Sequence, residues 1–182
     1  STCKRLTDPE LVRQELEKDY HVVVLDYDLN NHFDILEQLP HKEKCELLIN
    51  SCCAPRCPFR SEEYRLVGLQ QIAYNEHMKK HPDKPFNMSD YSADTVKKNI
   101  KCPSKGNNIF DSMKCSHHIS PDAIREKYLP MGYHQFKIEG RTASKLFLLE
   151  NYMYYLMKPE CRDEARFLFL HNLERNGLIK IG

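Results

Sequence analysis

Four cysteines from two stretches of the chain could together bind one metal centre. Cys53 and Cys57 form a C-x3-C pair, and Cys102 and Cys115 follow on a polar stretch of sequence. Four thiolates suit an iron–sulfur cluster or a tetrahedral zinc ion, because soft sulfur ligands favour those metals. The sequence therefore predicts a metal site made by these four thiols, with Cys52 as the alternative to its neighbour.

The spacing of the cysteines favours iron–sulfur over zinc. None of the eight cysteines forms the C-x2-C knuckle that is typical of structural zinc sites. Cys57 and Cys102 each precede a proline, as a ligand in ferredoxin motifs does. A radical-SAM motif would need a cysteine where Arg60 stands, which disfavours that class. We expect a four-iron four-sulfur cluster, with zinc as the alternative; the pair His117–His118 could supply an imidazole in place of one thiol.

Polar residues at strand ends and turns could bind a substrate. Asn50 ends one predicted strand, and Arg60 directly follows the cysteine motif. Lys137, Glu139 and Arg141 alternate along another strand, which points them to one side. Binding sites of parallel α/β folds lie at the carboxyl ends of strands, and arginine can hold an anion by two parallel hydrogen bonds. The alternatives are a structural ion pair at Glu139 and a surface role for Arg60. No residue is assigned a catalytic role.

The elements that must position these residues alternate between helix and strand. Apolar, β-branched runs predict buried strands over 21–28, 45–50 and 133–139. Capping residues and apolar spacing predict helices over 7–18, 61–80, 144–158 and 162–176, and another from 120 toward 130. Asn30 and Asn31 could cap a further short helix before residue 39. Helices alternating with strands indicate a parallel sheet.

The fold class predicted is therefore α/β, with one domain over 1–182. A polar stretch over 81–118, rich in proline, interrupts the alternation and carries two of the cysteines. Three strands are too few for a complete eight-stranded barrel, which needs roughly 250 residues. The chain is either a small open α/β domain or part of a (βα) barrel that is completed elsewhere.

Two segments resemble a known family. Residues 47–60, LLINSCCAPRCPFR, are similar to a cysteine signature of the collagenase-like peptidases, peptidase family U thirty-two. Residues 136–142, FKIEGRT, are similar to a strand and turn of the same family, and the resemblance spans about 22–158. It implies a partial TIM-like (βα) barrel of which this chain is the C-terminal half.

The resemblance also implies a cofactor and two kinds of activity. Several members of the family carry a four-cysteine iron–sulfur cluster and take part in hydroxylation of RNA bases or of ubiquinone precursors, and others are classed as peptidases. Cys53 and Cys57 match the motif directly, and Cys102 and Cys115 are the remaining pair. The Cys52–Cys53 doublet departs from the motif and leaves open which thiol is the ligand.

Three functions follow from these observations. The first is an iron–sulfur barrel protein that acts in hydroxylation of RNA bases or of a small aromatic substrate. The second is a peptidase-like hydrolase. The third is a non-catalytic, metal-stabilised binding subunit. Because the first half of the barrel has no counterpart, a partner chain could supply it. RNA or a small anionic molecule is the expected substrate.

Composition excludes other classes. A formal net charge of +1 gives no reason to expect a basic nucleic-acid arm. No run approaches the roughly 18 apolar residues of a membrane span, and no apolar leader opens the sequence. Cysteines without a secretory signal indicate a reducing compartment, so we expect a cytoplasmic protein. There is no G-x-G-x-x-G, P-loop or G-x-S-x-G motif, so nucleotide-dependent and serine-hydrolase classes have no support.

Overall fold

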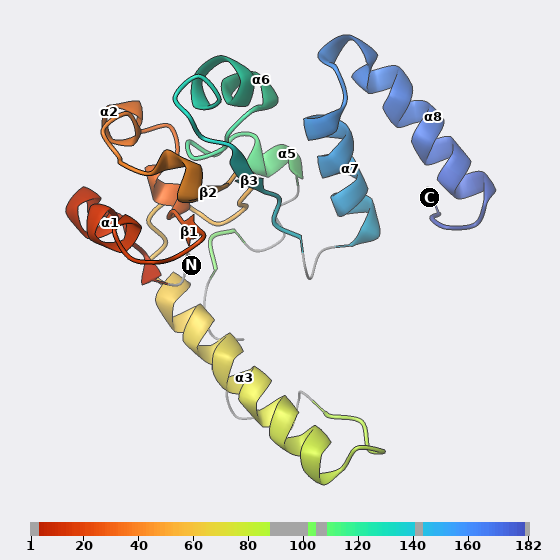
Figure 1. Ribbon diagram of the computed structural model, residues 1–182. Coiled ribbons are helices and arrows are strands. Elements are labelled where there is room, and N and C mark those ends of the chain that lie inside the picture. The colour runs from red at the N-terminus through yellow and green to blue at the C-terminus, as the bar shows by residue number, and fades with distance from the viewer. Residues whose placement is uncertain (1–3, 88–101, 105–108, 141–143, 181–182) are drawn as a thin grey trace. The chain divides into compact units, whose positions relative to one another are not determined.

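The computed structural model describes residues 4–87, 102–104, 109–140 and 144–180 (Figure 1). The chain divides into two compact units. The first comprises Ser1–Pro55 and Gly106–Gly182, and the second comprises Arg56–Lys105. The prediction of one domain over 1–182 stays a prediction, and so does the extent of the irregular stretch over 81–118, part of which lies outside the described residues.

The first unit contains a three-stranded parallel sheet. Strands β1 (Val23–Val24), β2 (Cys45–Leu48) and β3 (Gln135–Lys137) lie in that order. Val23 pairs with Cys45, and Leu47 pairs with Phe136. The parallel α/β class is thus confirmed. The strands are shorter than the apolar runs that predicted them. At β1 the reason is local, because the Asp26 carboxylate accepts a hydrogen bond from the amide of Asp28 and starts the 3-10 turn η2 (Tyr27–Leu29).

Helices in the first half of this unit begin at polar caps, as predicted, although one cap differs. The Asp8 carboxylate accepts hydrogen bonds from the amides of Glu10 and Leu11 and so starts α1 (Pro9–Leu16). The next helix, α2 (Phe33–Leu36), has no side-chain cap. Its predicted cap, Asn30, donates instead to two distant backbone carbonyls. The prediction was wrong because a buried amide with acceptors nearby is satisfied through tertiary contacts.

Short turns and longer helices complete the unit. The turn η3 (Lys42–Lys44) leads into β2, and α5 (Ile109–Ser112) precedes α6 (Pro121–Ala123), which Ser120 caps. A π-helical turn, η5 (Ile124–Tyr128), continues α6. Ser144 caps α7 (Lys145–Leu156), η6 (Pro159–Cys161) follows, and α8 (Arg162–Arg175) ends before Gly177 at φ 67°. Glycine accepts this left-handed conformation without strain.

The core of the first unit packs against the sheet. Its buried members are Val12, Leu16, Val23, Leu25, Leu29, Leu36, Leu39, Cys45, Leu47, Ile49, Ile119, Tyr128 and Tyr133. Tyr133 is fully buried, and its hydroxyl donates to the carbonyl of Leu36 at 2.8 Å. That bond satisfies a polar group that would otherwise be costly to bury.

The second unit is built on one helix. Helix α3 (Arg60–Lys80) has 21 residues, as the sequence predicted for this segment. The chain after it folds back, and the ring of Phe86 packs edge-on against Tyr74 at 5.6 Å and against His77 at 5.4 Å. The ring nitrogen Nε2 of His77 hydrogen-bonds the carbonyl of Lys84 at 3.1 Å. Among all described helices, none is long and apolar enough to cross a membrane.

Candidate functional site

Asn50 ties together the carboxyl ends of two strands and a helix. It lies two residues beyond β2 and is 1% exposed. Its Nδ2 donates to the carbonyl of Glu139 at 3.0 Å and to Oδ1 of Asn151 on α7 at 2.8 Å. Its Oδ1 accepts the amide of Glu139 at 2.6 Å. Both amide hydrogens of Asn50 are therefore used by the protein. Its predicted substrate contact stays a prediction, and the geometry gives it a positioning role.

Three thiols gather beside this network. Cys52 lies two residues after Asn50, and its Sγ donates to the carbonyl of Asn50 at 3.8 Å. Cys52 is also close enough to Cys53 and to Cys115 to interact electrostatically with both. Cys115 comes from the segment after α5, and its Sγ donates to the carbonyl of Asp111 at 3.5 Å. Two predicted ligands, Cys53 and Cys115, therefore share one edge of the sheet with Cys52.

The surroundings of Cys52 and Cys115 favour the protonated thiol. Burial, and after it the charge of Glu139, raise the pKa of Cys52 to about 11, although a hydrogen bond with Ser112 acts in the opposite direction. Burial and then Asp111 raise the pKa of Cys115. A thiol needs a nearby positive charge to become a thiolate at neutral pH. The charged side chains that raise these two pKa values are acids, Glu139 for Cys52 and Asp111 for Cys115, and a bound cation would counter them.

The polar residues predicted on the third strand have different surroundings. Burial raises the pKa of Glu139, while a hydrogen bond with Ser51 and the charge of Lys137 lower it. Lys137 forms an ion pair with Glu46 on β2 at 3.2 Å. Lys137 thus has a structural ion-pair partner in the neighbouring strand, and its substrate contact stays a prediction. Arg141 lies outside the described residues.

The remaining predicted ligands belong to the second unit. Cys57 and Cys102 are free thiols, the first buried and the second half-buried, and Arg60 begins α3. The predicted set of four is thus divided between the two units, and its assembly stays a prediction. Within the described parts of the chain, no group of three or more His, Cys, Asp or Glu side chains is arranged to hold a metal ion.

The sequence did not reveal the buried polar groups that hold this edge together. Asn30 is 3% exposed, and its Nδ2 donates to the carbonyls of Leu48 and His117, both at 2.8 Å. The ring nitrogen Nε2 of His117 lies 3.1 Å from the carbonyl of Ser51 and must carry its proton to donate there. Asn151 is fully buried on α7. A buried asparagine in an apolar helix was the one available signal, because such a residue needs partners.

Tyr155 fastens α7 to the sheet. Its hydroxyl lies 3.1 Å from the carbonyls of both Ile49 and Ile119. Tyr155→Phe is expected to lower the free energy of unfolding by about 1 kcal/mol, because the hydroxyl is lost while the carbonyls stay desolvated. Tyr152→Phe is the matched control, since Tyr152 is 45% exposed on the same helix. Urea denaturation would measure both, and equal stability of the two variants would contradict the assigned role.

The comparisons with known proteins give a short match. A protein of Methanocaldococcus jannaschii, described as an uncharacterized protease, is 34% identical over 54 residues. The alignment covers 29% of this chain and 16% of that protein. No family model matches the chain. No solved structure matches it either. The match links the chain to a protease-like protein over one segment, and it leaves the family of the whole chain as a proposal.

Proposed function

We propose that this chain is part of a (βα) barrel related to the collagenase-like peptidases, and that its cysteines hold an iron–sulfur cluster at the carboxyl edge of the sheet. The observation that carries the proposal is the approach of Cys115, from a separate segment, to Cys52 of the Cys52–Cys53 doublet. Carboxyl ends of parallel strands are where such folds place their binding sites.

The residues at this edge fit a thiolate-bound group. Thiols are the donors that iron–sulfur clusters use, and Cys57 and Cys102 of the second unit would complete the set of four. Buried thiols beside acidic groups are unfavourable as bare thiolates, so a cationic centre is what makes this donor set stable in its ligating form. Cys53 remains the proposed ligand of the doublet, with Cys52 as the alternative. Zinc is the alternative occupant.

A bound cluster would supply redox chemistry at this centre. Redox chemistry suits hydroxylation of an RNA base or of a small aromatic substrate. Glu139 interacts with Cys52, and partial burial raises the pKa of this carboxyl although the residue as a whole is exposed, so it would hold a proton more readily than a free carboxyl does. Asn50 and Asn151 fix its backbone, while Arg60 and Arg141 remain proposed contacts to an anionic substrate.

A second function has one observation in its favour. The matched protein of Methanocaldococcus jannaschii is described as a protease, which supports a peptidase-like hydrolase. The third function, a binding subunit, rests on the short sheet, whose outer strands β1 and β3 each pair on one side only in the described residues. Exposed edges of a parallel sheet favour pairing with further strands, so a partner chain remains proposed. A cytoplasmic location is proposed because cysteines without a secretory signal indicate a reducing compartment.

Metal analysis of single-cysteine variants tests the proposal. After anaerobic purification, the wild type is expected to show a broad visible absorption band with bound iron and sulfide. Cys57→Ser and Cys115→Ser are each expected to lose most of the iron, because three thiolates hold a four-iron cluster poorly. Comparing Cys52→Ser with Cys53→Ser identifies the ligand of the doublet. Cys161→Ser is the matched control, since Cys161 is exposed beside α8.

The outcomes separate the three functions. Zinc in place of iron, lost in the same variants, would favour the metal-stabilised subunit. Cleavage of gelatin by a preparation stripped of metal would favour the hydrolase. Absence of both metals from an anaerobic preparation would contradict the four-thiol site itself.

A further inference from the structure

A small cavity lies between α7 and α8, and no cysteine is among its lining residues. Its volume is about 110 Å³, and two arginines of α8 line it with residues of α7 and of the segment after α5: Met113, Glu150, Met153, Tyr154, Arg162, Asp163 and Arg166. All of these residues belong to the first unit. The space suits a group of a few heavy atoms, and its chemistry depends on which of the charged side chains are already paired.

One of the two arginines is paired. Arg166 donates from Nε to Glu150 at 2.6 Å, and the Glu150 side chain is only 13% exposed. Each charge compensates the other, so this pair leaves little attraction for a ligand. The remaining acid, Asp163, is exposed, so water screens much of its charge.

The other arginine has unused donors. The guanidinium of Arg162 lies over the ring of Tyr154, with 4.7 Å between Cζ and the ring centroid. Its Nε and Nη2 are both buried, and neither has a hydrogen-bond partner in the part of the chain that the structure describes. Burying an unpaired, charged donor costs free energy, and proteins tolerate that cost chiefly at sites that bind something.

The unused atoms form the edge of the guanidinium that grips a carboxylate. Nε and Nη2 point the same way, so two parallel hydrogen bonds can reach both oxygens of one carboxylate. Arg65 on α3 shows this geometry in the same chain, donating from Nε at 2.8 Å and from Nη2 at 2.7 Å to the two oxygens of Glu62. Arg162 has the same edge and no such partner.

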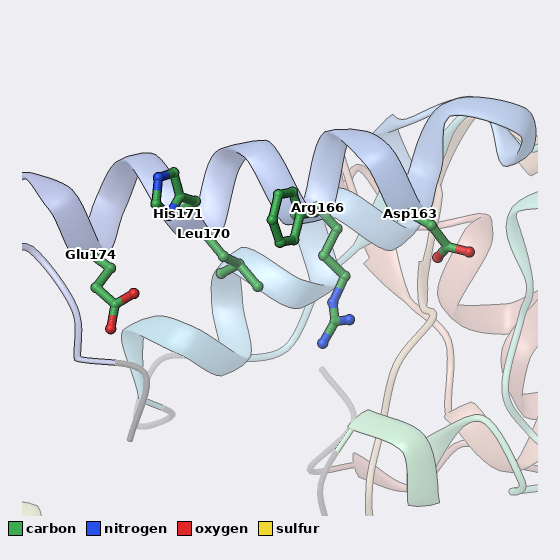
Figure 2. Close-up of a pocket in the computed structure, with 6 residues that line it drawn as sticks. Asp163, Arg166, Leu170, His171 and Glu174 are labelled. Atoms are coloured by element: carbon green, nitrogen blue, oxygen red, sulfur yellow. The ribbon is translucent and has the colours of Figure 1, made fainter.

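A larger hollow adjoins the cavity. It has a volume of about 460 Å³, runs along α8 and shares Asp163 and Arg166 with the smaller cavity. Figure 2 shows Arg166 and Leu170 extending from the same side of α8. Phe167, which is 70% exposed, and Leu170 give this hollow an apolar lining. A ligand with its charged end at Arg162 would therefore lay an apolar part on α8.

We propose that Arg162 is a binding residue for the carboxylate of a small amphipathic acid whose apolar part lies along Phe167 and Leu170. Arg162 lines the cavity, and because its Nε and Nη2 are buried, binding requires the guanidinium to turn so that this edge meets the ligand. A carboxylate is favoured over a phosphate, because Asp163 and Glu150 leave the lining nearly neutral and would repel a doubly charged group more strongly.

Titration with simple acids tests the site, with the nitrogen and proton resonances of the arginine Nε groups as the readout. Hexanoate is expected to bind saturably and to shift the Arg162 resonance. Acetate is expected to bind about tenfold more weakly or less, because it lacks methylenes to bury. Hexanol is expected to bind more weakly than hexanoate because it lacks the negative charge. Inorganic phosphate is expected to bind more weakly because it carries more negative charge than a carboxylate does.

Two variants are expected to change the affinity for hexanoate in opposite directions. Arg162→Gln is expected to weaken hexanoate binding about tenfold or more, and Asp163→Asn to strengthen it by about two- to threefold. Arg175→Gln, an exposed position at the end of α8, is the matched control and should bind as the wild type does. The buried Nε and Nη2 of Arg162 have no hydrogen-bond partner among the described residues. The melting temperature of Arg162→Gln should therefore be no lower than that of the wild type.

Three results would overturn the proposal. The first is equal hexanoate affinity in the wild type and Arg162→Gln. The second is phosphate or hexanol binding as tightly as hexanoate. The third is no saturable binding of hexanoate by the wild type.

Discussion

Replacing Asn50 with alanine is expected to lower the free energy of unfolding by about 3 kcal/mol, the largest loss that any single polar residue of the sheet edge should cause. The change removes three hydrogen bonds at once. It leaves Oδ1 of Asn151 and the backbone of Glu139 without the partners they have at 2.6–3.0 Å. Because Asn50 is 1% exposed, water cannot replace those bonds without opening the edge.

Urea denaturation of Asn50→Ala, two further single variants and one double variant would measure the effect. Asn172→Ala is the exposed control on α8 and should stay within about 0.5 kcal/mol of the wild type. Asn151→Ala should cost less than Asn50→Ala, and the double variant should cost less than the sum, since the two amides share a bond of 2.8 Å. Strict additivity would show that the two side chains do not act as one network.

The same network bears on function. It holds the backbone of Glu139 against the turn that carries Cys52 and Cys53, so loosening it should disturb the thiols without removing one. Asn50→Ala is therefore the variant in which stability and metal content are expected to fall together. Cys115→Ser should reduce metal content with little change in the backbone of the edge.

Local patterns accounted for much of the fold. The apolar runs placed all three strands, and the caps at Ser120 and Ser144 lie where the sequence predicted helix starts. These features depend on neighbours in the chain, which is why the sequence carries them. Strand length is different, because it depends on pairing. Val23 and Val24 pair with β2, and the 3-10 turn η2 begins soon afterwards.

The site was predictable in part. Its position after β2 was predicted from the motif and from the topology of parallel sheets, and the joint use of Cys53 and Cys115 as ligands stays a prediction. The residues that fix it could not be read in this way. Asn30 reaches acceptors 18 and 87 positions away, and Asn50 reaches a side chain 101 positions away. No spacing rule connects positions so far apart in the sequence. Sequence analysis therefore predicts that such a polar residue caps a helix or binds a substrate.

Acid is expected to weaken the fold through His118. The ring nitrogen Nε2 of His118 lies 3.4 Å from the hydroxyl of Tyr154, and the side chain is half-buried. Burial lowers the pKa of His118 from 6.5 to about 4, and its neighbour His117 contributes in the same direction. The folded state therefore keeps this imidazole neutral at a pH where the unfolded chain already binds a proton.

The sign of the effect follows from proton uptake. Between pH 6.5 and about 4 the unfolded state binds more protons than the folded state, so stability is fully present above pH 6.5 and falls as the pH drops. Solvent reaches part of the side chain, so we expect a loss of about 2 kcal/mol across this window.

Comparison of two histidine variants separates the contribution of His118 to the pH dependence of stability from that of carboxylates that titrate in the same pH range. Denaturant midpoints at pH 7 and pH 4 should differ less for His118→Asn than for the wild type, because the asparagine cannot take up a proton. His134→Gln, at an exposed position on the way into β3, retains His118 and should keep the full acid-dependent loss. An equal loss of stability in His118→Asn and the wild type would show that other groups cause the acid sensitivity. The contact between His118 and Tyr154 would then serve only to pack α7 against the segment that carries Cys115.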